Sequence, residues 1–261
     1  MRAHHAEAIR RLGEHFSQQP GYIAVLVGGS IAKGVESEFA DIDTMLIVTD
    51  ELYQSMGGLG APGYFSTQFC DYPGGYVDGK IYDKAYLRSA ADHGNEPTRA
   101  AFQAMIVAFC ADPEVEGLVR SIPVYQVREK EAKLRSFWAQ FEAAYWYFGE
   151  ALRRGDRYLL LHSTSDLVLY GGRLILAHNE ILFPYHKLFM ATLQGAPEKP
   201  EGLMELIAAL VDDPREETAR AFHEAVRGFR QWSEPPEPWN VRFMRDTELA
   251  WLEGAPYVGD R

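Results

Sequence analysis

The sequence predicts an α+β fold, because strand and helix patterns alternate in its first half and only helix patterns follow in its second half. Short apolar runs at 22–27 and 41–48, each bounded by glycine or aspartate, are typical of buried strands. From about residue 129 onward, apolar residues recur at helical spacing. We therefore expect one domain at 1–123 and a helical domain at 124–261.

The first half is expected to begin with an amphipathic helix at 4–18, which Pro20-Gly21 ends. A short helix at 30–33 separates the two apolar strands, and loosely alternating patterns predict further strands at 64–70 and 76–82. The segment from 85 to 110 is expected to be helical. These elements alternate as in a sheet flanked by helices.

The second half is expected to form a bundle of helices at 129–153, 157–182, 185–193, 203–211 and 216–232. The first of these helices carries a dense aromatic stripe, which we interpret as core packing. The aromatic residues at 239–251 are expected to dock on the bundle.

Composition excludes several classes of protein. The 261 residues carry a formal net charge of −11, which disfavours a nucleic-acid backbone as a partner and favours a cationic small molecule. Two cysteines in apolar surroundings do not indicate a disulfide framework. No signal peptide or membrane span is expected, so the sequence predicts residence in the cytoplasm.

The most informative motif is Gly28-Gly29-Ser30 followed by Asp41 and Asp43. A strand that ends in a glycine turn lets the backbone approach a phosphate closely. Two carboxylates at i and i+2 on a strand point to the same face. Such oxygen ligands suit a magnesium ion that also binds nucleotide phosphates.

A third acid is expected on the strand at 76–82. Asp78, Lys80 and Tyr82 share its polar face, while apolar residues alternate with them. Asp78 is therefore the preferred third carboxylate. Asp83, in the following loop, is the alternative.

Taken together, Gly28-Gly29-Ser30, Gly34 and Asp41-Ile42-Asp43 resemble the signature of the DNA polymerase β-like nucleotidyltransferase superfamily. Within it the chain resembles small antibiotic-modifying enzymes of the kanamycin and lincosamide type. The signature covers roughly the first quarter of the chain. Segments 96–102 and 111–113 resemble kanamycin-type relatives, and segment 179–187 resembles one found in related members. The resemblance implies a mixed-sheet catalytic domain followed by a helical bundle.

It also implies the roles of particular residues. Asp41, Asp43 and Asp78 would hold two Mg²⁺ ions, while Gly28, Gly29, Ser30 and Lys33 would bind the triphosphate of ATP or another nucleotide. Asp78 is expected to deprotonate the acceptor hydroxyl. Kanamycin-type relatives use a glutamate on the first bundle helix instead, where this chain has Glu142 and Glu150.

Three function classes remain open at this stage. The first transfers AMP to a hydroxyl of a small molecule such as an aminoglycoside-like antibiotic, which would confer antibiotic resistance. The second modifies a partner protein, as in toxin–antitoxin or AMPylation systems. The third binds nucleotide without catalysis. Either a monomer or a homodimer agrees with the resemblance.

Overall fold

The computed structural model describes residues 1–60, 63–252 and 254. The chain divides into two compact units, Met1–Tyr125 and Gln126–Arg261. The division after Tyr125 lies close to the predicted boundary after residue 123. Each unit has its own hydrophobic core, so each is described by itself.

The first unit is built on a five-stranded sheet of order β3-β4-β2-β1-β5. Strand β2 pairs with β4 in parallel, and all other pairings are antiparallel, so the sheet is mixed. The elements in chain order are α1 (Ala3–Ser17), β1 (Tyr22–Val27), α2 (Gly29–Ala32), β2 (Ile42–Val48), α3 (Asp50–Ser55), β3 (Tyr64–Ser66), β4 (Val77–Tyr82), α4 (Lys84–His93), α5 (Glu96–Ala101), β5 (Ile106–Cys110) and α6 (Pro113–Ser121).

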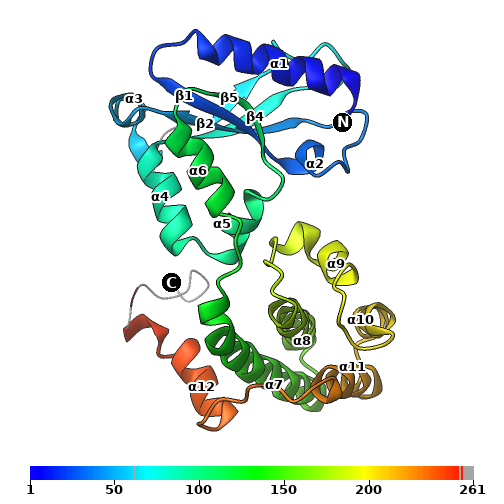
Figure 1. Ribbon diagram of the computed structural model, residues 1–261. Coiled ribbons are helices and arrows are strands. Elements are labelled where there is room, and N and C mark those ends of the chain that lie inside the picture. Colours follow the sequence, from blue (N-terminus) through cyan, green and yellow to red (C-terminus); the bar gives the residue numbers. More distant parts are fainter. Residues whose placement is uncertain (61–62, 253, 255–261) are drawn as a thin grey trace. The chain divides into compact units, whose positions relative to one another are not determined.

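Helices cover both faces of this sheet (Figure 1). Helix α1 buries its apolar face on one side, against alternate residues of β1, β2 and β4. Helices α4 and α6 cover the other side, over the remaining alternate residues of the same strands. The strands therefore read as continuous apolar runs, because both of their faces are buried over most of their length.

The prediction of a helix as far as residue 110 is wrong at its end. Helix α5 ends at Ala101, Ala104 adopts a left-handed φ of 59°, and Ile106–Cys110 form β5. This strand pairs with the free edge of β1. An apolar run of five residues is compatible with either a helix or a strand. It forms a strand here because the edge of β1 is available for pairing.

A buried arginine holds the helices of this face together. The side chain of Arg99 is 1% exposed and donates hydrogen bonds to the carbonyls of Ala91, Gly94 and Ile122 at 2.8–2.9 Å. These acceptors lie at the ends of α4 and α6. A buried guanidinium is tolerable because its donors are satisfied. The segment 96–102 therefore has a structural role.

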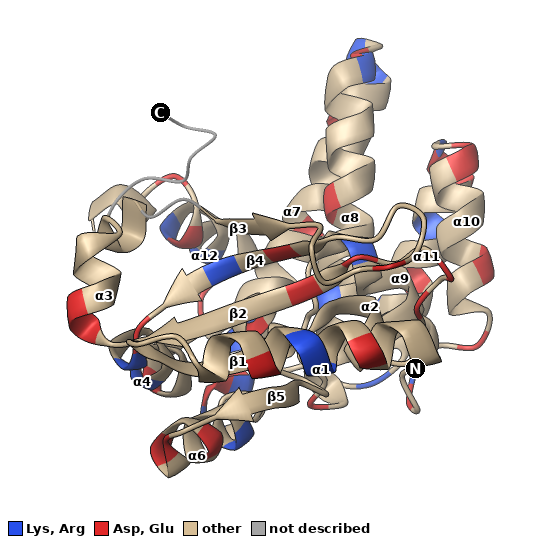
Figure 2. Cartoon of the chain, turned by 90° about the horizontal axis from the view of Figure 1, so that it is seen from above, with Lys and Arg blue, Asp and Glu red and all other residues tan. Residues whose placement is uncertain are grey.

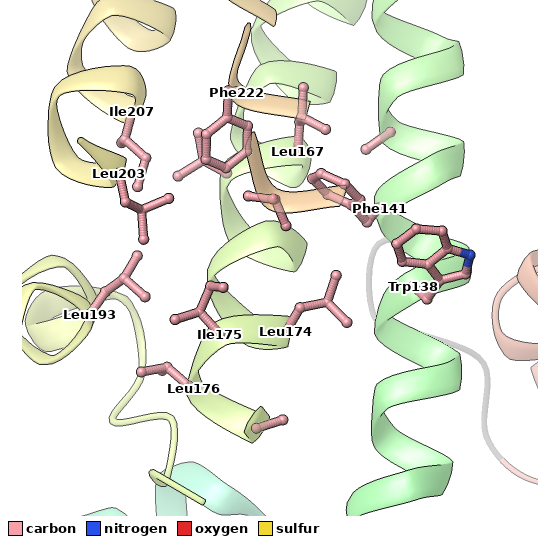
Figure 3. Close-up of a cluster of buried hydrophobic side chains, with 14 of the residues drawn as sticks. Trp138, Phe141, Leu167, Leu174, Ile175, Leu176, Leu193, Leu203, Ile207 and Phe222 are labelled. Carbon is pink, nitrogen blue, oxygen red and sulfur yellow. The ribbon is translucent and has the colours of Figure 1, made fainter. Parts of the chain in front are cut away.

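The second unit consists of helices, as predicted. They are α7 (Lys130–Arg154), α8 (Arg157–His178), α9 (His186–Gln194), α10 (Leu203–Asp212), α11 (Glu216–Gly228) and α12 (Trp239–Asp246). Figure 3 shows side chains of α7, α8, α10 and α11 meeting in one cluster around Phe141, Leu167 and Phe222. Trp138, Phe141 and Phe148 of the aromatic stripe of α7 are buried here, Phe137 and Tyr145 pack against them, and α12 packs on α7. No helix in the described part of the chain is long and apolar enough to cross a bilayer.

His5 of α1 is expected to make the first unit sensitive to acid. Its side chain is fully buried, both ring nitrogens lack a hydrogen-bond partner, and it lies beside His4, Arg2 and the N-terminus, with Glu36 opposing them. Burial first, and then the charge of His4, lower its pKa below 6.5. Protonation therefore favours the unfolded state as the pH falls through this value.

We expect the hydrogen-exchange protection of β1 and β2 amides to fall between pH 7 and pH 5, and His5→Leu to flatten this dependence. The variant loses the titrating group while keeping an apolar side chain in the core. Exchange measured by mass spectrometry at matched chemical rates tests this. An equally steep pH dependence in the variant would assign the effect to other groups.

Candidate active site

The parallel pairing of β2 and β4 brings two predicted carboxylates together. Asp43 lies directly opposite Asp78 in the register of the two strands. In-register residues of neighbouring strands point to the same face, with the strands about 4.8 Å apart. Both side chains are exposed, at the end of the sheet face that α4 and α6 do not cover. Figure 2 shows the acidic positions of β2 and β4 side by side.

The glycine turn lies against the first of these carboxylates. Gly28 directly follows β1 and donates its backbone N–H to the carbonyl of Asp43 at 2.9 Å. Gly29 follows with a left-handed φ of +65°, and a Cβ added there would lie 1.8 Å from Oδ2 of Asp43. Only glycine meets both conditions. The conformation of the turn and the position of the Asp43 carboxylate therefore depend on each other.

Two further predicted residues lie beside this turn. Ser30 is half-buried in the first turn of α2, and its carbonyl accepts from Val35 N at 3.1 Å. Lys33 directly follows α2 and is half-buried as well. Burial lowers the pKa of Lys33, and the negative charge of Asp43 opposes this shift. A cation thus lies within electrostatic range of the Asp43 carboxylate.

Asp41 lies in the loop just before β2. Near it is Tyr76, a residue that the sequence analysis did not predict for the site. The pKa of Tyr76 is raised, first by the negative charge of Asp41 and then also by Asp78 and Asp43. All three carboxylates therefore lie within electrostatic range of one phenol. Tyr76 precedes β4 as Asp41 precedes β2, a signal readable only once the strands are known to pair.

The donor set fits magnesium that arrives with a nucleotide. Within the described ranges, no three His, Cys, Asp or Glu side chains are arranged so that they could hold a metal ion. Magnesium does not require such a cage, because it binds through one or two carboxylates while phosphates and water complete its shell. Asp43 and Asp78, with Asp41 beside them, supply oxygen ligands of this kind.

Other predicted acids have different surroundings. Asp83 is buried and caps α4 by accepting from Tyr86 N at 2.8 Å, so the alternative third acid is a helix cap. Glu142 of α7 belongs to the second unit, where its carboxylate bonds to Nε2 of His223 at 3.1 Å. Glu150 pairs with Arg153 and Arg154. Lys80 is exposed on the same face of β4 as Asp78.

Comparisons with known proteins are sparse. No family model matches the chain, and no curated protein matches it. A solved structure described as a nucleotidyltransferase-like protein from Exiguobacterium sibiricum 255-15 is similar with a TM-score of 0.47 and 11% identity, over 85% of this chain and 72% of that chain. A likeness this weak carries no functional conclusion, so the proposals below rest on the side chains of the present chain.

Because Gly29 lies so close to Asp43, adding one methyl group at Gly29 is expected to have a large effect on ligand binding. We expect Gly29→Ala to weaken binding of magnesium and a non-hydrolysable ATP analogue by at least about 10-fold, because the new Cβ displaces the Asp43 carboxylate and so disturbs metal ligation. Isothermal titration calorimetry checks this.

Gly34→Ala is the matched control. Gly34 has a similar φ of +68°, but nothing lies within 4 Å of an added Cβ. The Gly34→Ala variant is therefore expected to lose only about 1 kcal/mol of stability, which is the cost of an alanine in the left-handed conformation. Equal losses in the two variants would show that backbone strain, and not the Asp43 contact, is responsible.

Proposed function

We propose that this protein is a magnesium-dependent nucleotidyltransferase, which moves a nucleoside monophosphate, AMP from ATP, to a hydroxyl group of a small molecule. The observation that carries the proposal is the in-register pair Asp43 and Asp78, placed next to the glycine turn that contacts Asp43. A phosphate-binding turn beside paired carboxylates suits phosphoryl chemistry better than any other reaction of these groups.

The proposed roles follow from this placement. Backbone N–H groups of the turn and the Ser30 hydroxyl bind the terminal phosphates, and Lys33 adds a positive charge. Asp43 and Asp78, with Asp41 beside them, would share magnesium with the phosphates, and that ion would neutralise charge on the phosphates during transfer. The proposed side chains therefore come from β2 and β4, from the loop before β2, and from α2 with the residue that follows it.

The reaction is a displacement at the α-phosphorus. The acceptor hydroxyl loses its proton to a base, and its oxygen forms a bond to the α-phosphorus. The bond from that phosphorus to the oxygen bridging to the β-phosphate breaks, and pyrophosphate leaves. Attacking and leaving oxygens lie roughly in line. With pyrophosphate at the turn after β1, the acceptor would approach from the side of β4, and the proposed base for its proton is Asp78, which lies on that strand.

The acceptor is proposed to be small and cationic. The chain has a net charge of −11, and the open end of the sheet adds three carboxylates. Both features favour a positively charged acceptor such as an aminoglycoside-like antibiotic. Modification of a partner protein is the alternative.

Labelled ATP tests the reaction type. With ATP labelled at the α-phosphate, we expect label on hydroxyl-bearing small molecules, and with ATP labelled at the γ-phosphate we expect none. Label on protein alone would favour the alternative. Nucleotide binding without any transfer, over a broad set of acceptors, would favour the non-catalytic module.

We expect Asp43→Asn to lower the transfer rate by at least about 100-fold, because it removes charge that stabilises the reacting phosphates. The fold should persist, since the side chain is exposed on an open face. Single-turnover rates and circular dichroism check both points. Asp92→Asn, an exposed acid on α4, is the control and should transfer at the rate of the unchanged protein.

The Asp78→Asn variant distinguishes two roles of Asp78, that of a general base and that of a metal ligand. If Asp78 is the general base, the transfer rate falls by about 100- to 10,000-fold while the affinity for the magnesium triphosphate changes little. The rate should then recover partly at higher pH, as hydroxide replaces the base. A loss confined to triphosphate affinity would make Asp78 a metal ligand only.

A further inference from the structure

An exposed aromatic side chain lies in one row with the glycine turn and the paired carboxylates. Phe65 of β3 is the register partner of Asp78, and Asp78 is the register partner of Asp43. On the other side of Asp43, Gly28 donates to its carbonyl at 2.9 Å. Figure 2 shows β3, β4, β2 and β1 side by side in this order. At about 4.8 Å per strand, the row is about 14 Å long.

The Phe65 side chain lies on the open face of the sheet. Register partners point to the same face, so Phe65 is on the side of Asp78 and Asp43. The adjacent Tyr64 points the other way, toward α1, where its ring packs on that of Phe16 at 5.3 Å. Phe65 is 66% exposed, and in the described part of the chain it belongs to neither hydrophobic cluster of this unit. Its ring is therefore accessible to a ligand on this face.

A second aromatic ring supports the first. The Tyr76 ring lies 5.4 Å from the Phe65 ring, inclined by 33°. Tyr76 directly precedes β4, and its carbonyl accepts from Ile42 N at 2.9 Å, so the backbone of Tyr76 is held against the start of β2. The two rings together form an aromatic surface carried by the sheet. A surface that is already ordered loses little conformational entropy when a ligand binds.

The order of the row corresponds to the order of the groups in the proposed displacement. Leaving pyrophosphate, α-phosphorus and acceptor oxygen would lie roughly in line. Pyrophosphate is proposed to lie at the glycine turn and Asp78 to be the base, so the acceptor would lie beyond Asp78. Phe65 is the next position of the row on that side. The aromatic surface is therefore on the side of the acceptor, at the opposite end of the row from the glycine turn.

We propose that Phe65 and Tyr76 form an acceptor subsite, on which an amino-substituted saturated ring, such as that of an aminosugar, stacks with its apolar face. This proposal rests on the proposed function. Stacking removes the exposed Phe65 ring and the C–H groups of the ligand from water, which favours binding. Ammonium groups on such a ring are attracted to the aromatic faces and to the neighbouring carboxylates. A hydroxyl of the stacked ring would then lie beside Asp78.

The test compares two affinities by isothermal titration calorimetry. The first probe is the α,β-methylene analogue of ATP with magnesium, and the second is kanamycin, titrated into protein saturated with that analogue. The rings of kanamycin are saturated and carry amino and hydroxyl groups. We expect Phe65→Ala to weaken kanamycin binding by at least about 10-fold, because the stacking surface is lost, and to leave the affinity for the analogue unchanged. Phe65→Tyr, which keeps an aromatic ring, should bind kanamycin as the unchanged protein does.

Val107→Ala is the matched control. Val107 is 41% exposed on β5, the opposite edge of the same sheet. It is the register partner of Leu26, which belongs to the cluster covered by α4 and α6, so Val107 is on the same face as Phe65. The variant likewise removes an exposed apolar side chain from an edge strand. Both of its affinities should equal those of the unchanged protein.

Four results would overturn the subsite. Unchanged kanamycin affinity in Phe65→Ala excludes stacking on this ring. A loss of affinity for the ATP analogue in Phe65→Ala means that the ring contacts the nucleotide instead. If the unchanged protein binds the analogue but not kanamycin, the subsite for an amino-substituted ring is wrong, while the proposed transfer is still judged by the labelling with ATP. If it does not bind the analogue with magnesium, the proposed function itself fails, and the subsite fails with it.

Discussion

The parallel pairing of β2 with β4 is the constraint on which the first unit depends. Its register is fixed by burial, because Ile42 and Val77 are a pair and both are completely buried. A slip by one residue would turn every side chain of β4 to the opposite face. Val77 would then enter solvent and Asp78 would enter the core under α1. The same pairing that buries the apolar residues thus places Asp78 beside Asp43.

The candidate site is open because of where the helices of that face end. Helices α4 and α6 cover Ile47 of β2 and Ala24 of β1, but not the end of the sheet where the carboxylates lie. Burying several carboxylates together would cost far more than the apolar packing there could return. An open, acidic end of the sheet is therefore the arrangement in which these groups can stay charged for a cation and its phosphates.

The glycine turn and the segment before β4 act on the carboxylates from opposite sides. The turn contacts Asp43 so closely that no Cβ fits at Gly29. The segment before β4 holds the loop around Asp41, through hydrogen bonds from the Tyr72 hydroxyl to the carbonyl of Ala40 and from Ile42 N to the carbonyl of Tyr76. Both contacts restrict groups that would otherwise be mobile on a surface, which is how binding sites gain pre-organisation.

Much of the molecule was determined by the sequence alone. Tyr22–Val27, the glycine turn and the strand ending at Val48 are local patterns whose apolar runs and turn residues allow few alternatives. The helices of the second half follow in the same way from their periodicity. The tertiary structure decided what depends on pairing. Ile106–Cys110 became a strand because an edge of β1 was free to pair, and Asp83 became a helix cap because α4 begins beside it. Tyr76 could be assigned to the site only from the alignment of β4 with β2. Sequence spacing does not tell in which direction two strands run when a long connection separates them.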